Sequence, residues 1–264
     1  MSSHFIAKDA QAYDSMMGRW SRELAPLLIG FAGVATGDRV LDLGSGTGSL
    51  AFSLPADVAL VIGVDYAQMY VDAASARNSS GHISFEQGDG HALRFGDAGF
   101  DCALSQLVIQ HVPDPVQVLR EMRRVTRPGG VVAAAVWDSF GGMGAHRMLW
   151  DTASVIDPDA AKRRAKSMTR KAAQPGGLRE LFAEAGFTGI VSTELLVRMA
   201  FVDFADYWQP MLDGEGSLGN YVTALGDDAR ERLRLLLLDA YLSGQPDGPR
   251  SFVSVAWAVK ALVR

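Results

Sequence analysis

Short apolar segments alternate with amphipathic segments through five successive units between residues 39 and 137. Apolar runs such as Ala59–Val64 (ALVIGV) and Val131–Trp137 (VVAAAVW) are typical of strands buried on both faces of a sheet. The intervening segments carry apolar residues at helical spacing, and Asp114 and Pro115 are a favourable start for one of them. This alternation predicts an α/β fold with a doubly wound, Rossmann-like, mostly parallel sheet and right-handed crossovers.

The alternation ends after Trp137, and the rest of the chain divides differently. Helices are expected over 10–31, 145–172, 178–185 and about 203–243, and two β-rich stretches over 189–201 and 251–263. We interpret the last two strands as antiparallel strands that complete the sheet. A single domain spanning 1–264 is then predicted, with a helical lid (1–35), a cofactor-binding core (36–140) and cap segments for the substrate (142–175 and 203–245).

Composition limits the partners that the protein is expected to have. Its net charge of -5 over 264 residues argues against general nucleic-acid binding, which needs a basic field. No apolar run is long enough for a membrane span, and the N-terminus lacks the pattern of a secretory signal, so a cytoplasmic location is expected. Cys102 is the single cysteine, and the acidic residues and histidines show no metal-ligand spacing, so no metal is predicted. The oligomeric state stays open.

A glycine loop, Gly44-Ser45-Gly46-Thr47-Gly48, follows the first predicted strand, and a helix is expected to run from Ser49 to Leu54. Ligands of open α/β sheets bind beyond the carboxyl ends of the strands, and glycines let the backbone approach them closely. Alone, the run is a weak signal that also fits a structural turn. Its third glycine comes too early for the dinucleotide pattern GxGxxG, and no Lys-Ser/Thr pair follows as in an ATP-binding loop.

Asp42 stands just before the loop. A carboxylate there would repel a pyrophosphate and would suit a ligand that carries sulfonium and ammonium groups. S-adenosylmethionine combines those charges with an adenosine. The loop therefore predicts a binding site for this cofactor, formed by Asp42, Gly44, Ser45, Gly46 and Gly48.

Polar residues at the ends of later strands extend the candidate site. Asp65 ends the second strand about 20 residues after the loop, at the place of an acid that accepts hydrogen bonds from ribose hydroxyls; as a single acid it also fits a helix cap. Tyr66 and Met69 could pack against the adenine ring.

The third and fourth strands end in further candidates. In Gly88-Asp89-Gly90-His91, Asp89 could accept from the adenine amine while the backbone N–H of Gly90 or His91 donates to a ring nitrogen; the alternative is a loop turn. Ser105 and Gln106 could contact the methionine part of the cofactor, or be polar strand ends only.

With these residues in place, the chain resembles class I S-adenosylmethionine-dependent methyltransferases, and among them the ubiquinone/menaquinone-biosynthesis group. The matching segments are VLDLGSGTGSL, VIGVDYAQM, FEQGDGHALRF, FDCALSQLVIQHVPD and EMRRVTRPGG, over about residues 38–137. The resemblance implies a seven-stranded sheet with a last antiparallel strand inserted near one edge. It also implies that Tyr13 and Arg19, in the lid-like segment AYDSMMGRW, could approach the cofactor carboxylate; simple packing of that helix is the alternative.

The function expected from these features is methyl transfer from S-adenosylmethionine to a small-molecule acceptor by direct displacement, at an O-, C- or N-nucleophile. His111 is the candidate general base, where a locally packed histidine is the alternative, and His91 and His146 are weaker candidates. A regulatory or sensor protein that binds the cofactor without catalysis is the second hypothesis, and a nicotinamide-dependent oxidoreductase the third.

The cap segments carry the remaining signals. Aromatic residues such as Trp150, Tyr207 and Trp208 could line a pocket for a partly apolar acceptor, or fill the core of the cap. The basic run from Lys162 to Lys171 fits a solvated helix face, or a surface that attracts an anionic substrate.

Overall fold

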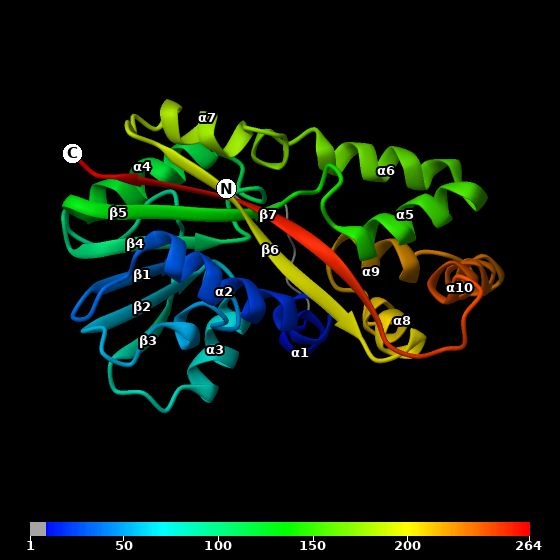
Figure 1. Cartoon of the computed structure of the whole chain (residues 1–264). Coiled ribbons are helices and arrows are strands. Elements are labelled where there is room, and N and C mark those ends of the chain that lie inside the picture. Colours follow the sequence, from blue (N-terminus) through cyan, green and yellow to red (C-terminus); the bar gives the residue numbers. More distant parts are fainter. Residues whose placement is uncertain (1–8) are drawn as a thin grey trace.

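A computed structural model describes residues 9–264, apart from the side chains of residues 166 and 167. Its strands form one seven-stranded sheet in the order β3-β2-β1-β4-β5-β7-β6 (Figure 1). They are β1 (Arg39–Leu43), β2 (Leu60–Asp65), β3 (Ile83–Gln87), β4 (Phe100–Gln106), β5 (Thr126–Trp137), β6 (Val191–Phe201) and β7 (Arg250–Leu262). The first five strands are parallel, and β7 is antiparallel to both β5 and β6. The predicted fold class is confirmed, with the last strand inserted beside the edge strand β6.

With one exception, the helices occur in the segments where the apolar periodicity predicts them. They are α1 (Ala10–Tyr13), a π-helical turn (Asp14–Gly18), α2 (Arg19–Ala32), α3 (Gln68–Arg77), α4 (Pro115–Val125), α5 (Gly144–Ile156), α6 (Pro158–Met168), a 3₁₀ turn (Lys171–Ala173), α7 (Gly177–Glu184), α8 (Phe204–Leu212), α9 (Gly216–Thr223) and α10 (Asp227–Leu242). Asp114 caps α4, since its carboxylate accepts from the backbone N–H of Gln117 at 3.0 Å.

The helix expected from Ser49 to Leu54 is wrong. This stretch forms turns and a short 3₁₀ helix over Ala51–Ser53. Gly48 enters it in the left-handed region at φ 90°, and Leu54, which precedes Pro55, is already extended. The residue before a proline disfavours helical backbone, so too few residues remain for a regular α-helix.

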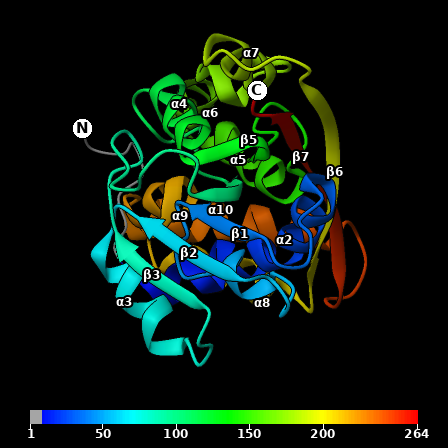
Figure 2. The ribbon, with the colours of Figure 1, turned by 90° about the vertical axis from the view of Figure 1, so that its left-hand side faces the viewer.

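Strand residues alternate between two apolar cores, one on each face of the sheet. Val40 and Leu104 pack on the face that α2 covers, whereas Leu41 and Ala103 pack with the residues of α4 and α7. Figure 2, which looks along the strands, shows α4 and α7 on one side of the sheet and α2 on the other. The core on the α2 side continues into α5, α8, α9 and α10, so sheet and cap share one apolar interior.

The cap helices, α5, α6, α8, α9 and α10, gather beyond the carboxyl ends of the parallel strands (Figure 1). β6 and β7 extend toward them as a two-stranded ribbon, because β5 pairs with β7 only as far as Ala256. An isolated bridge joins Met143 to Ser254 on this ribbon. None of the helices within residues 9–264 is long and apolar enough to cross a membrane. The prediction about a secretory signal falls mainly on residues 1–8, outside the described residues.

Candidate active site

A cavity of about 890 Å³ opens at the carboxyl ends of the parallel strands. We call its two sides the loop wall and the cap wall. The loop wall comprises Gly44, Gly46, Asp65, Tyr66, Met69, Asp89, Gly90 and His91. The cap wall comprises Trp137, Phe140, Met143, His146, Arg147, Trp150, Arg164 and Arg170. Tyr13, Gln106 and His111 also line the cavity. The topology therefore brings most of the predicted site residues to one place.

Backbone hydrogen bonds and close packing determine the conformation of the glycine loop. The N–H groups of Gly44 and Ser45 both donate to the carbonyl of Val64, at 2.7 and 3.1 Å. A Cβ atom on Gly44 would lie 2.1 Å from Val108, so only glycine fits there. Gly46 also has a positive φ, of 52°, but its missing Cβ would meet only Tyr13, at 4.0 Å. The backbone of Gly46 is thus open to a ligand.

Asp65 links the loop to the end of β2. Its Oδ2 accepts from the N–H of Gly46 at 2.8 Å, and its Oδ1 accepts from the N–H of Ala67 at 2.9 Å. Burial raises the pKa of Asp65, and these backbone hydrogen bonds oppose the rise. A carboxylate has about four acceptor sites, so Asp65 can take further donors from a ligand in the cavity.

Asp42 lies beneath the loop and does not line the cavity. It is 1 % exposed, and its Oδ2 accepts from the N–H of Ala51 at 3.1 Å. Burial raises its pKa to about 7, with Asp65 contributing, against the Ala51 hydrogen bond. The charge argument made for Asp42 is therefore not supported, because its carboxylate lies under the loop and not against the ligand.

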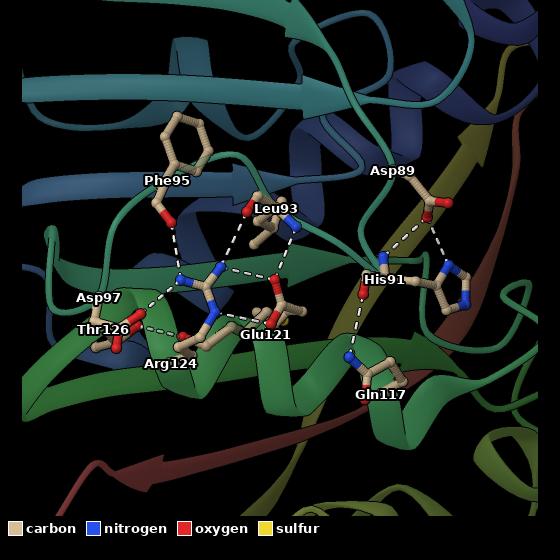
Figure 3. A network of polar contacts seen from close by, with 10 residues as sticks. Asp89, His91, Leu93, Phe95, Asp97, Gln117, Glu121, Arg124 and Thr126 are labelled. Atoms are coloured by element: carbon tan, nitrogen blue, oxygen red, sulfur yellow. Dashed lines mark hydrogen bonds and ion pairs between the residues drawn. The ribbon is translucent and has the colours of Figure 1, made fainter.

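Asp89 belongs to a loop that α4 fixes in place (Figure 3). Its Oδ1 accepts from the backbone N–H of His91 at 2.9 Å and lies 2.6 Å from the His91 Nδ1. These hydrogen bonds lower the pKa of Asp89, although partial burial opposes them. Gln117 of α4 donates to the His91 carbonyl at 3.2 Å.

Glu121 and Arg124 of α4 secure the next part of the same loop (Figure 3). Glu121 accepts from the N–H of Leu93 at 2.8 Å, and Arg124 donates to the carbonyls of Leu93 and Phe95 at 3.0 and 2.8 Å. Side chains of α4 therefore hold the loop that contains Asp89 and Gly90 at His91 and again at Leu93 and Phe95.

Four further predicted residues, besides Asp42, lie outside the cavity lining, each because of its own contacts within the protein. The guanidinium of Arg19 pairs with Asp206 at 2.6 Å and lies over the ring of Trp20. Ser105 is fully buried, and its hydroxyl donates to the Leu43 carbonyl at 3.0 Å. Ser45 and Gly48 are buried within the loop itself, and a Cβ atom on Gly48 would lie 2.5 Å from Phe52.

Gln106 and Tyr13 do line the cavity. Gln106 donates to the Ser21 carbonyl at 2.9 Å, while its buried Oε1 finds no hydrogen-bond partner within the described part of the chain. Tyr13 packs against the ring of Tyr70 with centroids 5.3 Å apart, and burial raises its pKa to about 12. Tyr66 and Met69 present exposed apolar surface beside them.

His111 lies between its neighbour Gln110 and the cap wall. Its Nδ1 lies 3.1 Å from Nη1 of Arg170, and its Nε2 lies 3.0 Å from the amide nitrogen of Gln110. A guanidinium can only donate, so the Nδ1 of His111 accepts from Arg170. His111 thus reaches the cavity, but in this arrangement its Nδ1 is occupied by a cationic donor.

Sequence reasoning missed most of the cap wall. His146 is half-buried there, and desolvation lowers its pKa to about 4, so the imidazole is neutral at pH 7. Leu107, directly after β4, lines the cavity with a φ of 64°, a strained backbone that occurs often at functional sites. The sequence signals for this wall were a basic run, scattered aromatic residues such as Trp150, and His146 as a weaker candidate base. Among the described residues, no group of three or more His, Cys, Asp or Glu side chains could hold a metal ion.

Comparison with known proteins agrees with this geometry. The family model described as a methyltransferase domain matches residues 41–134. The ubiquinone/menaquinone biosynthesis C-methyltransferase UbiE of Bdellovibrio bacteriovorus is 41% identical over 109 residues, which cover 40% of this chain and 46% of that protein. The chain spans less than half the length of the first curated relatives that it matches.

Two solved structures show the same fold over nearly the whole chain. YcgJ of Bacillus subtilis has a TM-score of 0.57 at 20% identity and covers 91% of this chain and 97% of its own. Phosphoethanolamine N-methyltransferase 2 of Haemonchus contortus, in complex with S-adenosyl-L-methionine, has a TM-score of 0.59 at 17% identity and covers 97% of this chain and 57% of its own. These two structures confirm the fold, while the methyltransferase-domain model and the UbiE relative confirm the resemblance to class I methyltransferases over the core of the chain.

Proposed function

We propose that the protein transfers a methyl group from S-adenosylmethionine to a small-molecule acceptor. The observation that carries the proposal is Asp65, whose carboxylate joins the glycine loop and faces the cavity at the end of β2. An acid at this position suits the ribose hydroxyls of an adenosine. The methyltransferase family model covers the same segment, and the Haemonchus contortus neighbour contains S-adenosyl-L-methionine.

The loop wall offers the contacts that this cofactor needs. Asp65 is assigned to the ribose, and Asp89 with the N–H groups beside it to the adenine, against which Tyr66 and Met69 pack. The buried Oε1 of Gln106 is an acceptor that the ammonium group of the methionine part would satisfy. Asp42, Gly44, Ser45, Gly46 and Gly48 hold the shape of the loop.

The chemistry places few demands on the protein. When bound, S-adenosylmethionine supplies a methyl group on a sulfonium that is already activated. The two walls align the acceptor with that methyl group and exclude water, which is the main source of rate enhancement in such a displacement. We assign residues 1–35 to a lid, 36–140 to cofactor binding, and 142–175 and 203–245 to the acceptor.

Calorimetry and a transfer screen test the proposal together. We expect S-adenosylmethionine and S-adenosylhomocysteine to bind, and NAD to bind far more weakly. A tritiated-methyl screen against phenols, quinones, amines and fatty-acid-like acceptors is expected to give a labelled product. Preferential binding of NAD would overturn the proposal. Tight cofactor binding without any transfer would favour the second candidate, a non-catalytic regulatory or sensor protein that the same loop wall would serve.

A further inference from the structure

We propose that the methyl acceptor carries an oxyanion, a carboxylate or a phosphate, and that Arg170 binds it at the cap wall. This inference rests on the proposed function, because it assigns the half of the cavity that the cofactor leaves open. It names the class of acceptor: an apolar body that ends in an anionic group.

The surroundings of Arg170 supply the first argument. Its guanidinium lines the cavity, and its Nη1 donates to the imidazole of His111 at 3.1 Å and to the Gln110 carbonyl at 3.4 Å. Both partners are neutral acceptors, and Arg170 forms no ion pair within the part of the chain that the structure describes. Desolvation lowers the pKa of Arg170, because partial burial makes the charged guanidinium less favourable. A charge-assisted hydrogen bond to an anionic ligand would offset this unfavourable burial.

His111 and Gln110 supply the second argument, because they fix the direction of the guanidinium. If Nδ1 of His111 accepts from Arg170, the neutral ring carries its proton on Nε2. That proton then faces the amide group of Gln110, whose Oε1 is buried without a hydrogen-bond partner among the described residues. Turning the amide over places Oε1 opposite the Nε2 proton and satisfies both groups. His111 is then a positioning residue for Arg170.

The distribution of charge along the cavity supplies the third argument. Among residues 9–264, the acids that line it are Asp65 and Asp89, and both lie in the loop wall. The arginines that line it within the same range lie in the cap wall, where Arg147 and Arg164 each contact Asp151 at 2.6 Å. The cavity therefore has an acidic end suited to a sulfonium cofactor and a basic end suited to an anion.

Apolar side chains lie in the same wall as the arginines. Trp137, Met143 and Trp150 are buried, and Phe140 is exposed at the cavity. A cavity of about 890 Å³ has room for a cofactor and a medium-sized second ligand. An acceptor with an apolar body and an anionic end would satisfy both kinds of side chain.

The test uses the whole protein saturated with S-adenosylhomocysteine, and calorimetry with three probes of similar size: benzoate, phenyl phosphate and benzyl alcohol. We expect at least one oxyanion to bind more tightly than the neutral alcohol, and the better of the two identifies carboxylate or phosphate. Arg170→Gln is expected to weaken that binding at least tenfold, in the range of a lost charge-assisted hydrogen bond. Arg170→Lys should recover part of it, since the charge remains but the planar fork does not.

Lys162→Gln is the matched control, because Lys162 belongs to the same basic run, is largely exposed and pairs with Asp159 outside the cavity. It should leave oxyanion binding unchanged. All variants should bind S-adenosylhomocysteine as the wild type does, which reports folding and an intact loop wall. Failure of the wild type to bind this nucleoside contradicts the proposed function. With nucleoside binding intact, the oxyanion proposal is wrong if benzyl alcohol binds as well as both anions, or if Arg170→Gln binds them like the wild type.

Discussion

The loop wall and the cap wall are built by opposite means. The loop wall uses short segments directly after β1, β2 and β3, and its contacts join residues close to strand ends, as in the hydrogen bond between Gly46 and Asp65. The cap wall uses helices from a different part of the chain, and its contacts join residues such as His111 and Arg170 that are 59 positions apart. The first wall is encoded locally, whereas the second exists only after the cap has folded onto the sheet.

Charge also separates the two walls, and its effect on stability can be measured. Asp42 beneath the loop wall has its pKa raised from 3.8 to about 7, so the folded state keeps a proton that the unfolded state has lost. Taken alone, this group makes the free energy of unfolding fall as the pH rises from 3.8 to about 7, by at most about 4 kcal/mol. Asp42→Asn should remove this contribution, so that in urea unfolding across that range the variant gains stability with rising pH relative to the wild type. Equal pH dependence in variant and wild type would show that Asp42 ionises normally.

The cap wall should show the reverse dependence. The pKa of His146 is lowered from 6.5 to about 4, so the unfolded state binds the extra proton in this range. Taken alone, this group makes the free energy of unfolding fall as the pH drops from 6.5 to about 4, by at most about 3 kcal/mol. His146→Gln should abolish that contribution, so that in the same unfolding series the variant loses stability with rising pH relative to the wild type. In the wild type the two effects largely cancel, and a double variant with the same pH profile as either single variant would contradict this account.

Cofactor affinity should distinguish Asp65 of the loop wall from Asp42 beneath it. Asp65→Ala is expected to weaken binding of S-adenosylmethionine about 30-fold, or ~2 kcal/mol, because it removes charge-assisted hydrogen bonds and frees the loop. Asp42→Asn should change the affinity little, since Asp42 does not line the cavity. Calorimetry at one pH, with circular dichroism to confirm folding, measures both. Normal affinity in Asp65→Ala would remove Asp65 from the site.

The smallest effect is expected for the adenine contact. Tyr66 is 54% exposed and lines the cavity, so Tyr66→Ala should not change the free energy of unfolding by more than a few tenths of a kcal/mol. It should weaken cofactor binding roughly fivefold, or ~1 kcal/mol, through lost ring packing. Val155→Ala, at an exposed position of α5 outside the cavity lining, is the control. A variant at Tyr66 that binds as tightly as this control would place the adenine elsewhere.

The sequence predicts the sheet well because buried parallel strands require continuous apolar runs, as in Ala59–Val64. It also predicts Asp65 and Asp89, since a residue directly after a strand must lie at the carboxyl edge. It does not reveal on which side of the loop a side chain lies, and so it wrongly placed the carboxylate of Asp42 against the ligand. Arg19 shows the same limit, because its partner Asp206 is 187 positions away. Arg170 could be recognised only as a member of a basic run, since its neighbours are set by tertiary packing.

The ribbon formed by the ends of β6 and β7 has a mechanical consequence. Beyond Ala256 it loses β5 as a sheet neighbour, and two-stranded ribbons are more strongly twisted than larger sheets. α8 follows β6 after two residues, so this twisted ribbon sets where the first of the last three cap helices lies relative to the sheet. A change in the twist of the ribbon would change that placement, whereas the loop wall directly follows β1, β2 and β3.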